Sequence, residues 1–179
     1  EIRAGGWPKP AGISLSGRTV GVVGLGDIGR NVASRAAALG LNVVGWDPAA
    51  GLVPEHVSHK TWPEGVGDCD FIVFACALNK VTKHIFNMQL LSLLKPGVRV
   101  INVSRGGLVD EQALLTGLED GRIASAALDV FENEPLGLSN PLREYKQLIF
   151  GSHNSSNTSD AVVRTSQKAL QMMKDFLND

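Results

Sequence analysis

The sequence predicts an α/β fold in which a parallel sheet is covered by helices on both faces, the doubly wound arrangement. Two observations lead to this prediction. Short runs rich in valine and isoleucine alternate along the chain with segments whose apolar residues recur at helical spacing. These runs are almost continuously apolar, as is typical of strands that are buried on both faces of a parallel sheet.

Each expected element has a signal of its own. Residues 18–26 read as a short strand that runs into a glycine turn. A helix over residues 27–40 is predicted from apolar residues at helical spacing and a glycine that ends it, namely Ile28, Val32, Ala36, Leu39 and Gly40. The other strands are expected at residues 41–47, 70–76, 99–104, 124–130 and 147–150, and the other helices near 87–97, at 110–121 and at 159–177. Residues 48–68 are the least regular and indicate connecting structure.

The composition is that of a globular protein whose charges nearly balance. Its 17 basic and 18 acidic residues give a formal net charge of −1. This charge predicts neither a nucleic-acid partner nor an anionic membrane surface. No apolar stretch reaches the roughly 18 residues of a membrane span, so a small molecule is the expected partner.

The cysteines and histidines do not have the spacing of a metal site. Cys69 and Cys76 form no C-x-x-C pair, and His56, His59 and His84 lack ligand partners at suitable spacing. We therefore expect no metal, reduced thiols and a cytoplasmic location. The chain begins with neither an initiator methionine nor a signal peptide, which suggests a piece of a longer soluble protein.

A glycine motif joins the first strand to the first helix. Residues 24–29, GLGDIG, place Gly24, Gly26 and Gly29 at the spacing G-x-G-x-x-G. Alone this pattern is weak, but here it follows an expected strand and opens an expected helix. Gly24 can make the tight turn, Gly26 can admit a pyrophosphate, and Gly29 can let helix and strand pack closely. The motif predicts a Rossmann-type dinucleotide site, and the alternative is an ordinary strand–helix turn.

Asp47 ends the second expected strand. A carboxylate at this place can accept hydrogen bonds from both hydroxyls of the adenosine ribose, and its charge repels a 2′-phosphate. Asp47 therefore predicts NAD as the cofactor rather than NADP. It is also suited to a turn before Pro48, and the two roles are compatible.

Three separated segments resemble the cofactor-binding domain of the D-isomer-specific 2-hydroxyacid dehydrogenases, which include phosphoglycerate, glycerate and lactate dehydrogenases. The segments are residues 101–114 (INVSRGGLVDEQAL), residues 127–136 (ALDVFENEPL) and the later His153. The resemblance covers nearly the whole chain, from the GGW of residues 5–7 to the terminal helix. The ordered set of motifs is specific, whereas no single motif is.

The resemblance implies a catalytic set of three residues. Arg105 would hold the substrate carboxylate and carbonyl oxygen, for which a planar guanidinium is suited. His153 would take the hydroxyl proton while hydride passes from substrate C2 to the nicotinamide, with Glu134 as its acidic partner. The alternatives are a surface arginine, a loop histidine and a solvated acidic turn. For Glu132, which competes with Glu134 for the partner role, we adopt the solvated turn.

The resemblance also implies the contacts with the cofactor. Asp27 and Ile28 would meet the pyrophosphate through their backbone, and Asp47 would meet the ribose. The other implied cofactor residues are Cys76 beside the adenosine, Val103 and Ser104 near the nicotinamide half, Asp129 toward the carboxamide, and Ser155 and Ser156 after the histidine.

The chain departs from the family pattern around this histidine. Many relatives read T-P-H-x-G/A-G/A, whereas here Ser152 precedes His153 and Asn154, Ser155 and Ser156 follow it. The proline that would stiffen the approach is missing. The orientation of His153 is therefore expected to depend on side-chain hydrogen bonds.

Family members have two domains, and this sequence resembles the cofactor domain that is inserted into the substrate domain. We expect residues 1–17 to be a linking arm, residues 18–158 the NAD-binding domain, and residues 159–179 a helix that returns toward the missing domain. Such a fragment would bind NAD but turn over substrate poorly, because one wall of the cleft is absent. The resemblance also suggests a homodimer formed through this domain.

Two functions are consistent with these residues. The first is an NAD-dependent oxidoreductase that acts on a small D-2-hydroxy acid or its 2-keto acid. The second is an NAD(H)-sensing binding module, similar to the transcriptional corepressors related to this family. Retention of Arg105, Glu134 and His153 favours the enzyme.

Overall fold

The chain folds around one parallel sheet. A computed structural model describes residues 2–9 and 11–178, so residues 1, 10 and 179 of the expected arm and terminal helix lie outside the described residues. Seven strands lie in the order β3-β2-β1-β4-β5-β6-β7, and all adjacent pairs are parallel. This confirms the predicted doubly wound, Rossmann-type sheet. The strands are β1 (Thr19–Val23), β2 (Asn42–Trp46), β3 (Val57–His59), β4 (Phe71–Phe74), β5 (Val98–Asn102), β6 (Ile123–Leu128) and β7 (Leu148–Phe150).

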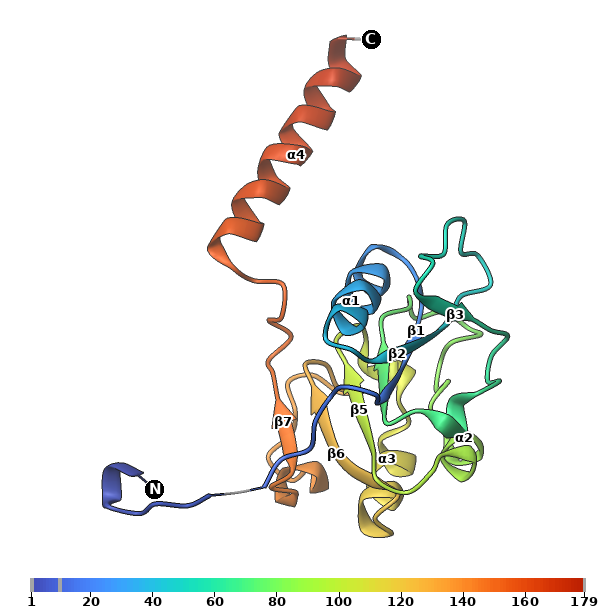
Figure 1. The fold of residues 1–179 in the computed structure, drawn as a ribbon. Helices are drawn as coiled ribbons and strands as arrows, with labels where there is room; N and C mark the ends of the chain where they lie inside the picture. The colour runs from blue at the N-terminus through green and yellow to red at the C-terminus, as the bar shows by residue number, and fades with distance from the viewer. Residues whose placement is uncertain (1, 10, 179) are drawn as a thin grey trace.

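Helices cover both faces of the sheet (Figure 1). The α-helices are α1 (Asp27–Ala38), α2 (Met88–Leu93), α3 (Glu111–Glu119) and α4 (Ser159–Asn178), and the short 3₁₀ turns are η1 (Ile2–Ala4), η2 (Val66–Asp68), η3 (Gly106–Leu108) and η4 (Pro141–Glu144). Helix α1 packs on β1 and β2, whereas α3 packs on β6 and against α2. All four α-helices were predicted from the sequence.

In β1, β2, β4 and β5, neighbouring residues enter two different apolar clusters, one on each face of the sheet, because successive side chains of a strand point to opposite faces. The cluster under α1 contains Val20, Val22, Ala33, Val43 and Val73. The larger cluster, under α2 and α3, includes Val44, Ile72, Leu90, Val100 and Leu114. Burial of each large apolar side chain contributes about 1.5–3 kcal/mol. Burial on both faces explains why the strands are apolar throughout.

One strand was not predicted. β3 lies in the segment for which we expected only connecting structure, and it pairs with β2 through Val57 and His59. Of its three residues only Val57 is buried. Such a short edge strand has no apolar run or alternation in its sequence, so the prediction for residues 57–59 was wrong.

The helix starts differ in how their free N–H groups are satisfied. Asn87 caps α2 by accepting a hydrogen bond from Leu90 N, and Asp110 caps α3 by accepting from Gln112 N and Ala113 N. The residue before helix α1, at its N-cap position, is Gly26, which has no side chain to accept a hydrogen bond. The first N–H groups of α1 are therefore available to an external anion.

The two ends of the chain extend away from the sheet. Figure 1 shows the N-terminal arm and α4 projecting outward, and none of the described residues of α4 is buried. Apolar side chains are exposed on both segments, including Trp7, Ile13, Leu170 and Phe176. Among the described residues, no helix is both long and apolar enough to cross a membrane.

Candidate functional site

The predicted site residues gather at one edge of the sheet. Parallel strands bring their carboxyl ends to the same edge, and ligands bind in doubly wound sheets where the chain order reverses. Here the order reverses between β1 and β4. The predicted residues follow these strand ends: Gly24 and Gly26 after β1, Asp47 after β2, Cys76 after β4, Val103, Ser104 and Arg105 after β5, Asp129 and Glu134 after β6, and His153, Ser155 and Ser156 after β7, while Asp27, Ile28 and Gly29 begin α1.

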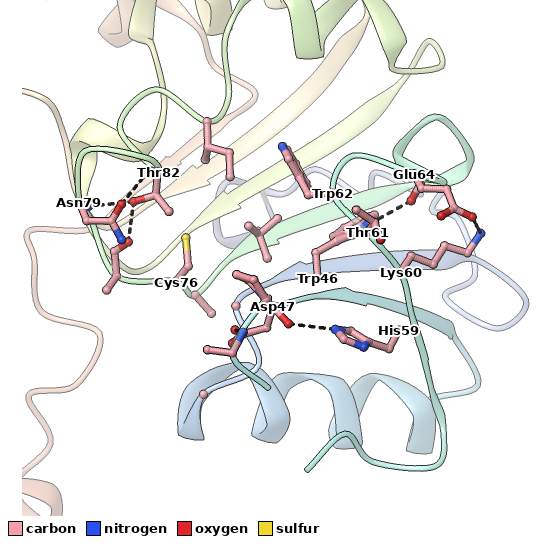
Figure 2. Close-up of a pocket in the computed structure, with 18 of the residues that line it drawn as sticks. Trp46, Asp47, His59, Lys60, Thr61, Trp62, Glu64, Cys76, Asn79 and Thr82 are labelled. Carbon is pink, nitrogen blue, oxygen red and sulfur yellow. Dashed lines mark hydrogen bonds and ion pairs between the residues drawn. The ribbon is translucent and has the colours of Figure 1, made fainter. Parts of the chain in front are cut away.

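A cavity of about 1000 Å³ lies at the ends of β1, β2 and β4. Its wall combines the glycine turn with both predicted adenosine residues, as Figure 2 shows for most of the side chains. Of the predicted cofactor residues it includes Gly24, Gly26, Asp47 and Cys76. This volume lies at the upper end of the range of about 300–1,000 Å³ that is typical of ligand pockets.

The three motif glycines serve three different steric needs. Gly24 has a φ of +95°, and a Cβ there would lie 2.6 Å from the backbone of Cys76. A Cβ on Gly29 would collide with the carbonyl oxygen of Gly24. At Gly26, however, a Cβ would have no atom within 4 Å. Gly24 and Gly29 are therefore required by the fold itself, whereas the open space over Gly26 fits an approaching pyrophosphate.

Asp47 is tied to the glycine turn by backbone hydrogen bonds. Its Oδ2 accepts from Leu25 N at 2.8 Å, and its Oδ1 accepts from Ala49 N at 2.9 Å. The carboxylate is half-buried and lines the cavity. Each oxygen keeps further acceptor capacity, since an ionised carboxylate offers about four acceptor sites. Both roles that the sequence suggested, turn residue and ribose ligand, are compatible with this geometry.

The far wall of the cavity consists of residues that the sequence did not point to. His59, at the end of β3, places Nε2 3.0 Å from the carbonyl oxygen of Asp47. Trp62 is half-buried and packs edge-on against Trp46, with ring centroids 5.1 Å apart. Both His59 and Trp62 line the cavity (Figure 2). They lie in the irregular segment 48–68, so no periodic pattern could have revealed them.

The turn that carries Arg105 is fixed by Asn102, a residue to which its sequence pattern gave no role. Asn102 ends β5 and is only 1% exposed. Its Nδ2 donates to Arg105 O at 2.9 Å, and its Oδ1 accepts from Ser104 N at 3.2 Å. Ser104 Oγ in turn donates to Cys76 O at 2.6 Å. The exposed Arg105 thus projects from a turn whose base is held rigidly.

His153 and Glu134 form the predicted pair. His153 Nδ1 lies 2.8 Å from Glu134 Oε2, and Glu134 Oε1 accepts a hydrogen bond from Phe131 N at 2.9 Å. The hydrogen bond from His153 and then that from Phe131 lower the pKa of Glu134 below its usual value. Glu134 therefore stays ionised and can hold a protonated imidazole nitrogen.

Asp129 holds the loop that carries His153. The carbonyl oxygen of Asp129 accepts from His153 N at 2.7 Å, while its carboxylate accepts from Asn154 N at 3.0 Å and Ser155 N at 2.9 Å. Burial raises the pKa of Asp129, but the hydrogen bonds from Asn154 and Ser155 outweigh this effect and lower it. Asn154 and Ser155 contact Asp129 through their backbone N–H groups, and the side chain of Ser155 adds a further hydrogen bond to it. A contact of Asp129 with the carboxamide stays a prediction.

His153 adopts a left-handed backbone conformation with φ +57°. This conformation is uncommon for a residue with a side chain, and the three hydrogen bonds to Asp129 maintain it. The imidazole borders a second cavity of about 640 Å³, which it lines with Glu134, Phe131, Leu136, Arg143 and Phe150 among others. His153 and Glu134 are therefore both accessible to a small molecule in this cavity.

Two predicted relationships differ in outcome. Arg105 lies at the same sheet edge as His153, but among the described residues it makes no hydrogen bond or ion pair with Glu134 or His153. Glu132 is not simply a solvated turn residue, because its Oε1 lies 3.0 Å from His84 Nε2. The interpretation of Glu132 as a solvated turn residue was therefore wrong.

The two cysteines are free thiols, with Cys69 buried and Cys76 half-buried. Burial raises the pKa of the Cys69 thiol to about 11 and raises that of Cys76 in the same direction. Both thiols are thus poorly reactive. Within residues 2–9 and 11–178, no group of three or more histidine, cysteine, aspartate or glutamate side chains is arranged to hold a metal ion.

Known proteins resemble this chain in sequence and in fold. Residues 1–155 match the family model for the D-isomer specific 2-hydroxyacid dehydrogenase, NAD binding domain. The D-3-phosphoglycerate dehydrogenase of Methanocaldococcus jannaschii is 38% identical over 170 residues, which cover 90% of this chain and 32% of that enzyme. The chain thus spans about a third of the length of the curated relatives it matches.

Two crystal structures extend this similarity to three dimensions. A glyoxylate reductase from Paecilomyes thermophila has a TM-score of 0.86 at 34% identity, covering 97% of this chain and 54% of that one. A D-isomer specific 2-hydroxyacid dehydrogenase from Xanthobacter autotrophicus Py2, in complex with NADPH and MES, has a TM-score of 0.76 at 35% identity, covering 85% of this chain and 49% of that one. The chain therefore belongs to the D-isomer specific 2-hydroxyacid dehydrogenase family, within which it corresponds to the NAD-binding domain.

Proposed function

We propose that the protein containing this chain is an NAD-dependent oxidoreductase, which transfers hydride between NAD(H) and a small D-2-hydroxy acid or its 2-keto acid. The observation that carries the proposal is the His153–Glu134 pair, joined at 2.8 Å. It lies at the same edge of the sheet as the glycine turn and Arg105. This edge thus combines a proton carrier, an anion holder and a dinucleotide cavity.

The cavity fits NAD in three respects. The backbone over Gly26 is open, the first N–H groups of α1 have no side-chain cap, and Asp47 offers a carboxylate at the cavity wall. Gly26, Asp27 and Ile28 would hold the pyrophosphate and Asp47 the ribose. The nicotinamide, when bound, supplies the hydride acceptor or donor. Val103, Ser104 and Ser155 and Ser156 are proposed to lie near that half.

His153 would act as the acid and base. Glu134 would accept a hydrogen bond from the N–H at Nδ1 of His153. The other nitrogen of the neutral imidazole, Nε2, is then free to take a proton. During oxidation the hydroxyl proton moves to Nε2 and the C2 hydrogen leaves as hydride. During reduction both transfers reverse. Glu134 stabilises the imidazolium that forms, since an opposite charge at hydrogen-bond distance favours the charged form.

Arg105 would position the substrate. Its guanidinium is exposed, and the backbone beneath it is fixed by Asn102. A guanidinium can hold a carboxylate by two parallel hydrogen bonds. This grip would fix the 2-carbon relative to His153 and thereby lower the entropy cost of the reaction. Arg105→Lys would keep the charge but lose the planar fork.

The proposed oxidoreductase activity is tested in the whole protein. NADH oxidation is measured with a panel of 2-keto acids, and His153→Ala should abolish turnover while NADH binding persists. Binding is followed by quenching of tryptophan fluorescence, because Trp62 lines the cavity. Absence of turnover with every acid, combined with tight NADH binding, would favour a sensor instead.

The preference for NAD is part of the proposal. Asp47 repels a 2′-phosphate, but a structural neighbour was crystallised with NADPH. Asp47→Ala should weaken NADH binding, and Asp47→Arg should weaken it while improving NADPH binding. An unchanged NADH affinity in both variants contradicts the ribose role.

The alternative of a corepressor-like binding module gains no support from the relatives named above, which are dehydrogenases or a reductase. We further propose that residues 1–17 and 159–179 connect to a substrate domain, since they expose Trp7, Ile13 and Phe176. A homodimer and a cytoplasmic location belong to the same proposal. Sedimentation velocity of the whole protein tests the dimer.

A further inference from the structure

Glu132 lies at a junction of four segments, outside the proposed catalytic set. Its side chain is 29% exposed and takes part in hydrogen bonds to two distant parts of the chain. The segments that meet here are the loop after β4, the turn after β5, the start of α3 and the loop after β6. Each contact can be traced separately.

The first contact joins Glu132 to α3. Glu111 N donates to Glu132 Oε1 at 3.1 Å, and Glu132 N donates to Glu111 Oε1 at 2.9 Å. The second oxygen of Glu111 accepts from Asn140 Nδ2 at 3.0 Å. This reciprocal pair satisfies one of the free N–H groups at the start of α3. It fixes the loop after β6 against the helix.

The second contact joins Glu132 to the loop that walls the cofactor cavity. His84 Nε2 lies 3.0 Å from Glu132 Oε1. His84 is held in a left-handed conformation, with φ +51°, and its N–H donates to Gly107 O at 2.8 Å. The same loop contributes Cys76, Asn79 and Thr82 to the cavity wall (Figure 2).

The third contact links this junction to Arg105 and Glu134, two residues of the proposed catalytic set. The backbone at Phe131 and Glu132 packs directly on Gly106, the residue after Arg105, where any Cβ would collide with it. Phe131 N donates to Glu134 Oε1 at 2.9 Å. A shift of the Phe131–Glu132 backbone would therefore move Glu134 and press on the Arg105 turn together.

We propose that Glu132 is a positioning residue: through His84 and Glu111 it fixes the backbone that sets Glu134 against His153 and seats the Arg105 turn. The effect of Glu132 on catalysis rests on the proposed function, whereas its effect on the positions of Glu134 and the Arg105 turn does not. Glu132 touches none of the proposed catalytic side chains and acts on them only through the Phe131–Glu132 backbone. Its side chain has partners that lie 21 and 48 residues away.

The test in this chain is the titration of the Glu134 carboxyl, followed by carbon-13 NMR. Glu132→Ala should raise the pKa of Glu134, because Glu134 then loses its fixed hydrogen bonds from His153 and Phe131. Loss of a nearby negative charge alone could only lower that pKa, so a rise reports displacement. Glu132→Gln loses the charge but keeps an acceptor oxygen for Glu111 N, so the pKa of Glu134 should not rise in this variant.

Matched controls separate this effect from general damage. Asn133→Ala changes the exposed neighbour and should leave the titration of Glu134 unchanged. His84→Asn removes the imidazole that contacts Glu132. Asparagine tolerates the positive φ at this position, and the variant should raise the pKa of Glu134, as Glu132→Ala does. An unchanged pKa of Glu134 in Glu132→Ala and His84→Asn, or a Gln variant that behaves like the Ala variant, would overturn the inference.

The catalytic part is measured in the whole protein. Glu132→Ala should lower kcat by roughly tenfold to a hundredfold, the loss that small misplacements cause, and should change the dissociation constant of NADH less than kcat. An unchanged kcat would overturn the catalytic meaning. Failure of the proposed function would look different, because the unsubstituted protein would then show no turnover while the titrations in this chain still report on Glu132.

Discussion

The backbone N–H of His153 donates to the carbonyl oxygen of Asp129 at 2.7 Å. Together with the carboxylate of Asp129, which accepts from the two following N–H groups, this bond closes the loop over the end of β6. The buried aspartate thus holds the exposed histidine without touching its ring. The loop needs no proline for its shape, because Asp129 supplies the constraint from the neighbouring strand.

Replacement of Asp129 by asparagine should therefore loosen the loop at His153. The variant has one acceptor oxygen where the carboxylate has two, and hydrogen bonds to a charged group contribute about 1.5–3 kcal/mol each. We expect the free energy of unfolding to fall by about 1–3 kcal/mol and the amide protons of Asn154 and Ser155 to exchange faster. Urea unfolding and hydrogen exchange measure these effects. Asp160→Asn, which removes an exposed charge on α4, serves as the control, and equal protection in both variants would contradict the anchoring role.

The glycines of the motif should separate stability from binding. A Cβ at Gly29 collides with the backbone of Gly24, whereas one at Gly26 meets no atom within 4 Å. Gly29→Ala should destabilise the chain by about 1–3 kcal/mol, as overpacking does. Gly26→Ala should unfold at the wild-type denaturant concentration yet bind NADH much more weakly. Urea unfolding and fluorescence titration measure the two properties, and wild-type NADH affinity in Gly26→Ala would rule out the pyrophosphate site at this turn.

The sequence allowed the sheet and the position of the glycine turn to be predicted, because their signals are local. The run from β1 through Gly29 contains a strand, a turn and a helix start within a few residues, and Asp47 follows at a fixed distance. The residues that support the proposed catalytic set could not be predicted in this way. Asn102 reads as an ordinary strand end until its side chain is seen bridging Ser104 and Arg105.

The pairing of His84 with Glu132 shows why the remainder was missed. The two residues are far apart in sequence, and neither lies in a periodic segment. Their contact depends on where two loops pass one another, which composition and spacing do not encode. The three-residue strand β3 was missed for a related reason, since its pairing with β2 is decided by the edge of the sheet and not by its own residues.

Acid should lower the free energy of unfolding by protonating Asp70, which holds the first residue of β1. Its carboxylate accepts from Thr19 N at 2.8 Å and lies 3.0 Å from Lys95 Nζ and 3.3 Å from Arg18 Nη1. Burial raises the pKa of Asp70, but the hydrogen bond from Thr19 and the contacts with Lys95 and Arg18 outweigh it and lower the pKa. The folded pKa thus lies below the unfolded value of about 3.9.

This shift gives a pH dependence with a definite sign. Because the folded state binds the proton less tightly, Asp70 contributes stability that is complete above the unfolded pKa and is lost as the pH falls through the folded pKa. Asp70→Asn should lower the free energy of unfolding by about 1–3 kcal/mol at pH 7, and the difference from wild type should shrink below about pH 4. Urea unfolding from pH 3 to pH 7 measures both, with the exposed Asp68→Asn as control. A difference that stays constant over this range would show that Asp70 acts through packing and not through its charge.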